Sequence, residues 1–145
     1  MPEKRTIQRA RKDKREGKSP STQAGEFVHE EIEHVREGKH GARSAKQAIA
    51  IGLSKARRAG VKVGTPKRAK ASTKKSARSA SSRAGKKVST TRSRATSEAL
   101  DREPRSAASH TALARQAKAS ARSRGKAARS KAAKKAARTR RSERK

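Results

Sequence analysis

Residues 29–34 read HEEIEH and carry the side chains best suited to bind a metal ion or to move a proton. In the zinc-binding pattern H-E-x-x-H, the two histidines are four residues apart and lie on one face of a helix. His29 and His34 are five apart, which on a helix is about 140° of rotation, so their imidazoles point to different sides. The pairs His29/Glu33 and Glu30/His34 have helical spacing, but two ligands do not make a site. We therefore expect no metal site and no cofactor, and interpret the stretch as a solvated helix face with local ion pairs.

Glu26, Glu30, Glu33 and Glu37 recur at helical spacing and form an acidic stripe. We interpret this stripe as docking on a basic helix, within the chain or between chains, rather than as a general acid–base centre, because nothing suggests a closed pocket around it. The sequence contains no G-x-S-x-G nucleophile elbow, no glycine-rich phosphate loop and no cysteine for a disulfide or a thiolate zinc site. These observations predict a protein that is not an enzyme.

The composition combines a high positive charge with few large apolar side chains. The 145 residues include 43 Lys and Arg but 12 Asp and Glu, for a net charge of +31, and Phe27 is the only aromatic residue. Ile, Leu, Val, Met and Phe together number 14. Such a chain buries too little apolar surface to offset the entropy lost on ordering, which excludes a conventional globular enzyme.

The apolar run at residues 48–53 is too short to cross a membrane. The N-terminus lacks an apolar signal region, so we expect a cytoplasmic protein.

A net charge of this size requires a polyanionic partner, and nucleic acid is the best candidate because phosphate neutralisation releases condensed counterions. Membrane binding is disfavoured, because the basic part offers only Val88, Leu100 and Leu113 as bulky apolar anchors. That part has no aromatic residue on which single-stranded bases could stack. Duplex DNA is therefore favoured over single-stranded DNA or RNA.

Charge divides the chain into two regions with different physics. Residues 1–60 hold 15 basic and 8 acidic residues, a net of +7, and residues 61–145 hold 28 basic and 4 acidic residues, a net of +24. We predict three segments: a basic arm or helix at 1–20, an α-helical hairpin module at 21–63, and a disordered Lys/Arg/Ala/Ser-rich tail at 64–145. The predicted fold is thus mostly α, a small αα-hairpin followed by a long intrinsically disordered basic tail.

Two helices of the hairpin are predicted from caps and apolar spacing. One follows the sequence SPST at residues 19–22 and ends at Gly38, and the other begins at the Ser44-x-x-Gln47 capping box and ends at Gly60. Nine large apolar side chains between residues 27 and 63 are too few to stabilise the hairpin alone. Three outcomes stay open: the module dimerises, folds on its ligand, or is only partly helical.

Residues 39–63, KHGARSAKQAIAIGLSKARRAGVKV, resemble the signature of a bacterial family of small basic proteins of unknown function, and the resemblance extends over residues 1–63. It implies a bacterial source and a DNA-binding role without any established activity. The tail resembles those of linker histones in composition. Residues 65–68, TPKR, resemble a short element of histone tails, and an ordinary turn between module and tail is an equally good interpretation.

We predict a nucleoid-associated protein that binds DNA largely without sequence preference, through a cationic tail and a module that sets register or self-associates. Alternatives are a ribosome- or RNA-associated basic protein, and an adaptor that binds a protein partner through the hairpin. Arg57 and Arg58 are expected to point toward solvent or phosphate, and Arg115, Lys118 and Arg122 to share one face if their segment becomes helical. The predicted DNA contacts are Arg43, Lys46, Lys55, Arg57, Arg58, Lys62, Lys67, Arg68, Arg115, Lys118, Arg122, Lys134 and Lys135.

Overall fold

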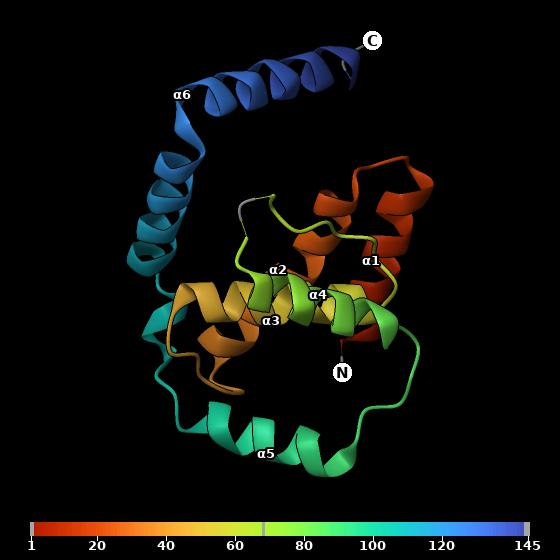
Figure 1. The fold of residues 1–145 in the computed structure, drawn as a ribbon, viewed down its shortest axis with the longest axis vertical. Helices are drawn as coiled ribbons and strands as arrows, with labels where there is room; N and C mark the ends of the chain where they lie inside the picture. Colours follow the sequence, from red (N-terminus) through yellow and green to blue (C-terminus); the bar gives the residue numbers. More distant parts are fainter. Residues whose placement is uncertain (1, 68, 144–145) are drawn as a thin grey trace. The chain divides into compact units, whose positions relative to one another are not determined.

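The computed structural model describes residues 2–67 and 69–143, and the regular elements in these ranges are all helical. The chain divides into two units, residues 1–109 and residues 110–145. The first unit contains α1 (Lys4–Arg15), α2 (Pro20–Glu37), α3 (Ala45–Arg58), α4 (Ala71–Ser82), α5 (Thr90–Asp101) and the 3-10 turn η1 (Arg105–Ala108). The second unit consists of α6 (His110–Glu143) (Figure 1).

The caps predicted for α2 and α3 are present. The Ser19 hydroxyl accepts a hydrogen bond from Thr22 N at 3.3 Å at the start of α2, and α2 ends at Gly38, whose φ of 78° suits a residue without a Cβ. The Ser44 hydroxyl accepts from Gln47 N at 3.3 Å, while the Gln47 side chain accepts from Arg43 N at 2.8 Å. This reciprocal arrangement fixes where α3 begins.

The core of the first unit is built on α2, which packs against both α1 and α3. Phe27 is fully buried and forms one cluster with Ala10, Ala24 and Ala56, with Ile7, Leu53, Val61 and Val63 around it. At Gly52, α3 lies so close to α2 that a Cβ on this residue would come 2.7 Å from Val28 Cα. The core therefore gains its burial from small residues and close helix contacts.

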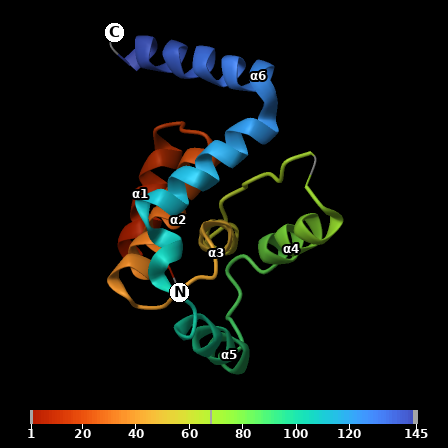
Figure 2. The ribbon, with the colours of Figure 1, turned by 90° about the vertical axis from the view of Figure 1, so that its left-hand side faces the viewer.

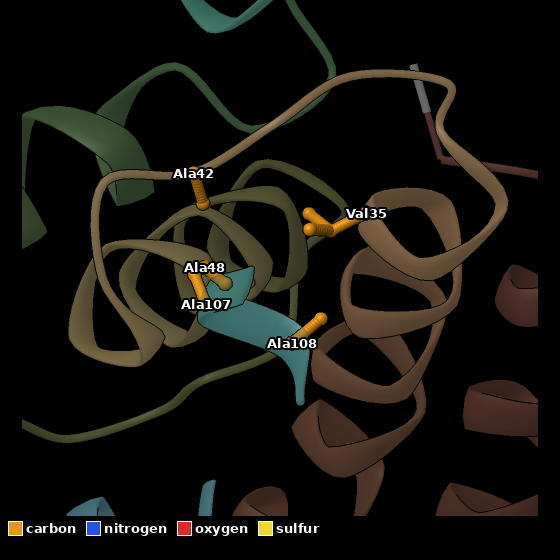
Figure 3. Packing of buried hydrophobic residues seen from close by; sticks show 5 residues of the cluster. All are labelled: Val35, Ala42, Ala48, Ala107 and Ala108. Carbon is orange, nitrogen blue, oxygen red and sulfur yellow. The ribbon is translucent and has the colours of Figure 1, made fainter. Parts of the chain in front are cut away.

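A second cluster shows how the C-terminal part of this unit completes the core. It contains Val35 and Ala48 together with Ala42 and with Ala107 and Ala108 of η1. Figure 3 shows Ala107 and Ala108 on the turn of chain that lies between α2 and α3. Backbone bonds from Gly41 N to Leu100 O (2.9 Å) and from Ala42 N to Pro104 O (3.0 Å) hold this turn in place.

The predicted disordered tail is wrong, because residues 71–143 form α4, α5, η1 and α6. The prediction counted only large apolar side chains. Alanine favours the helix strongly and buries well where backbones come close. Ala77 and Ala80 are buried on α4, which packs on α3, and η1 closes the cluster described above. The helical character that was predicted for the chain is confirmed.

The long helix α6 is interrupted once. Gly125 has φ 78° and ψ 167°, values outside the helical region, and separates a segment at 110–124 from one at 126–143 (Figure 2). Glycine reaches such a positive φ without the steric cost that a Cβ would bring. No helix in the described part of the chain is both long and apolar enough to span a membrane.

Candidate nucleic-acid interface

Most of the cations predicted to contact DNA from the region around α3 are solvent-exposed. The exposed ones are Arg43, Lys46, Arg58, Lys62 and Lys67. Arg68 lies outside the described residues. Two of the predicted set, Lys55 and Arg57, are instead turned toward the protein, for different reasons.

Lys55 faces α2 and neutralises two buried carboxylates. Its ammonium lies 2.6 Å from Glu31 Oε2 and 3.6 Å from Glu30 Oε1. Glu31 is fully buried and Glu30 is 4% exposed. A positive charge held in this way stabilises the contact between α2 and α3, so Lys55 is not among the cations that are open to a polyanion.

The prediction that Arg57 points outward is wrong, since its exposure is 8%. After α3 the chain reverses at Gly60, which has φ 89°. The reversal brings two carbonyl groups over the guanidinium, which donates from Nε to Val63 O (3.3 Å) and from Nη2 to Gly64 O (3.4 Å). Arg57 thus holds the chain that leads into α4, whereas its neighbour Arg58 is exposed as predicted.

A cationic cavity of about 340 Å³ lies beside Arg57, between the chain at 63–65 and α4. Lys74 and Arg78 of α4 contribute further positive charge, and its lining contains the hydroxyl-bearing residues Thr65 and Ser81 but no carboxylate. Three cations with two hydroxyls are a suitable environment for a phosphate group. Lys74 and Arg78 were not singled out from the sequence, because α4 was not predicted.

The helix α6 carries the largest number of Lys and Arg residues of any helix in the structure. Between residues 110 and 143 it carries 12 Lys and Arg and one Glu. All 12 cations are exposed, and none forms an ion pair with a carboxylate in the described part of the chain. Arg115, Lys118 and Arg122 follow at three- and four-residue spacing and share one face of the first segment. Lys134 and Lys135 lie on the second segment.

The acidic residues at positions 1–60, in contrast, lie close to positively charged or histidine side chains of the first unit. The eight carboxylates of residues 1–60 all have a cationic or histidine partner, and these pairs lie within 4 Å. Of the predicted acidic stripe, Glu30 reaches α3, Glu26 reaches Arg9 of α1 at 3.7 Å, and Glu33 and Glu37 pair with nearby His29 and Lys39. With 43 Lys and Arg against 12 Asp and Glu, most of the cations therefore have no carboxylate partner among the described residues.

Ion pairs shift the pKa values of two side chains, the Glu3 carboxyl and the Lys18 ammonium. A hydrogen bond with His34, followed by one from Lys39, lowers the pKa of the Glu3 carboxyl below its ordinary value of 4.5. Hydrogen bonds to Asp13 and Glu16 raise the pKa of the Lys18 ammonium well above its usual range. Both groups are on the surface, so these effects tune local charge more than global stability.

The fold also brings together three side chains that the sequence did not connect. Glu31 and His34 lie one helical turn apart on α2, and the loop after Gly38 returns His40 to them. One ligand atom from each lies within 4.8 Å of the other two. The spacing of Glu31 and His34 was visible in the sequence, but His40 follows the helix end and has no periodic relation to them.

Comparison with known proteins adds one similarity. Residues 11–69, from α1 to just before α4, match a family of unknown function (DUF6496). The expected resemblance of the N-terminal region to an uncharacterised family is confirmed at that level. No curated protein and no solved structure matches the chain.

Proposed function

We propose that the protein binds duplex DNA, largely without sequence preference, by neutralising backbone phosphates. The observation that carries the proposal is the set of 12 exposed cations on α6, none of which forms an ion pair with a carboxylate of the described residues. The second segment of α6 holds eight of these cations over a length of about 27 Å, which is one cation per ~3.4 Å of helix. Duplex DNA carries one phosphate per ~1.7 Å of its axis. A helix of this charge density can lie along a groove and contact phosphates of both strands.

The first unit supplies further contacts in this proposal. Arg43, Lys46, Arg58, Lys62 and Lys67 are exposed, and the cavity beside Arg57 accommodates one phosphate. A folded unit with a phosphate position gives the complex an orientation that a cationic helix alone does not provide.

Several finer points belong to the same proposal. The protein acts as a non-enzymatic component of a bacterial nucleoid, in the manner of linker histones, which its C-terminal composition resembles. The segment KQAIAIGLSKARRAG at residues 46–60 marks the relationship to the bacterial family described above. Duplex RNA presents a similar phosphate backbone, so ribosomal RNA is the alternative partner, and the hairpin formed by α2 and α3 can also contact a second copy of the chain.

Salt dependence tests the assignment of α6. Lys126, Lys134, Arg138 and Arg141 lie within about 120° on one face of the second segment. If all four contact phosphates, changing them to Gln lowers the slope of log K against log salt by about 3.6, at ~0.9 per contact. Fluorescence anisotropy with a labelled DNA duplex measures this slope.

A charge-matched variant serves as the control. Arg5, Arg11, Lys14 and Arg15 are exposed on α1 and have no ion-pair partner among the described residues. Changing these four to Gln removes the same net charge and should leave most of the slope in place. Equal losses from both variants would show that position does not matter and would refute α6 as the interface. Tighter binding to duplex RNA of the same length would favour the alternative partner.

A further inference from the structure

Glu31, His34 and His40 form a compact group of one carboxylate and two imidazoles between α2 and the loop that follows it. The Glu31 side chain is fully buried, and the two histidine side chains are 13% and 14% exposed. The imidazole rings are perpendicular, with centroids 6.1 Å apart. A group this buried is held in place by the fold, unlike the exposed pair of His29 and Glu33 on the same helix.

When both imidazoles are neutral, their hydrogen bonds leave one ring nitrogen of each with a free lone pair. His40 Nδ1 lies 3.0 Å from Gly41 O, a carbonyl that can only accept, so this nitrogen carries the proton. His34 Nε2 lies 2.9 Å from Glu3 Oε1 and donates to that carboxylate. Histidines that bind a metal ion usually donate their second nitrogen to a carboxylate or a backbone carbonyl in this way.

The Glu31 carboxylate is left without a hydrogen bond. Neither of its oxygens accepts one from the described residues, although both are buried. Lys55 Nζ lies 2.6 Å from Oε2 as an ion pair, while Oε1 faces His40 Nε2 at 3.4 Å. When His40 is neutral, two atoms with lone pairs therefore face each other in a buried site, an arrangement that a cation between them would stabilise.

We propose that Glu31 Oε1, His34 and His40 Nε2 bind one divalent transition-metal ion, with zinc as the best match. Two imidazoles and one carboxylate are a ligand set that zinc uses when a fourth position is left to water or another ligand. Ligand atoms around tetrahedral zinc are ~3.3 Å apart, from bond lengths of about 2.0–2.1 Å. The ligand atoms of the three residues lie within 4.8 Å of one another, so a small inward movement of the side chains brings them to these distances.

The consequence of binding is a link between α2 and the loop at residues 38–44. That loop also holds the chain at residues 100–104 through the backbone bonds from Gly41 and Ala42. A metal ion at this site therefore stabilises the packing of η1 against α2 and α3. This inference is independent of the proposed DNA binding, because the site contains none of the exposed cations.

Equilibrium dialysis of the full chain against zinc, without a histidine tag, tests the proposal, and the visible absorption of bound Co²⁺ reports its ligands. We expect one ion per chain and a rise in the unfolding temperature on binding. His34→Ala and His40→Ala should each abolish this binding, whereas the double variant His29→Ala/His110→Ala should keep it. Glu3→Gln, which removes the negative charge that His34 and Lys39 contact, should weaken binding by ~10–100-fold.

Circular dichroism shows whether each variant retains its helix content. If His34→Ala unfolds, His40→Ala and Glu3→Gln carry the test, because both side chains belong to residues outside the core clusters. Unchanged zinc binding by folded His40→Ala would overturn the proposal. Loss of zinc from the His29/His110 variant, or failure of the native chain to bind zinc or Co²⁺, would overturn it as well.

Discussion

The pairing of Lys55 with two buried carboxylates makes a strong prediction about stability. Glu31 is 0% exposed and Glu30 is 4% exposed. In Lys55→Ala, both lose the ammonium group that lies 2.6 Å from Glu31 and 3.6 Å from Glu30. Breaking a buried pair by removal of one partner costs about 3–5 kcal/mol. Because the Lys55 side chain is 20% exposed, water reaches the gap, and we expect a loss of about 3 kcal/mol, at the low end of that range.

Urea unfolding followed by far-ultraviolet circular dichroism measures this loss. Lys46→Ala is the matched control, because Lys46 is exposed on the same helix and has no ion-pair partner in the described part of the chain. Lysine and alanine differ little in helix propensity, so the control should change stability by no more than about 0.5 kcal/mol.

A second substitution separates charge from packing. Adding Glu31→Gln to Lys55→Ala removes one of the two uncompensated charges, so the double variant should be more stable than Lys55→Ala alone. A Lys55→Ala protein as stable as Lys46→Ala would refute the argument, since it would mean that Glu30 and Glu31 are solvated in solution. A double variant no more stable than Lys55→Ala would show that lost packing, not charge, causes the effect.

Two further predictions concern helix packing and pH. Gly25→Ala should stabilise the protein by about 0.5–1 kcal/mol, because its Cβ meets nothing within 4 Å on α2. Gly52→Ala should destabilise the protein, because strain of about 1–3 kcal/mol against the Val28 backbone exceeds the gain in helix propensity. If Gly25→Ala and Gly52→Ala shifted the urea midpoint equally, the close contact at Gly52 would be refuted. Because the pKa of Glu3 is lowered in the folded protein, its stabilising effect is complete above the unfolded value of 4.5 and is lost as the pH falls through the folded pKa. The stability difference between the native chain and Glu3→Gln should therefore shrink as the pH falls below about 4.5. A difference that grows below that pH would contradict this sign.

Local features of the sequence were sufficient for the helices α2 and α3. Ser19, Ser44 and Gln47 satisfy backbone groups within a few residues of themselves, and Gly38 and Gly60 end the helices through their own backbone freedom. The excess of positive charge is likewise a property of composition, and the exposure of Arg43, Lys46 and Arg58 follows from the cost of burying a cation.

Contacts between distant residues could not be read in the same way. The burial of Ala107 and Ala108 depends on Val35 and Ala48, which lie more than 50 residues earlier, and alanine gives no periodic signal strong enough to reveal it. Whether Lys55 and Arg57 face solvent or protein depends on Glu31 and on the reversal at Gly60, which place a carboxylate and two carbonyls beside them. His40 reaches Glu31 and His34 only because the loop after α2 folds back. Side-chain chemistry and helix ends are local properties of a chain, whereas burial and ligand geometry arise when separate segments meet, and that meeting is a property of the whole fold.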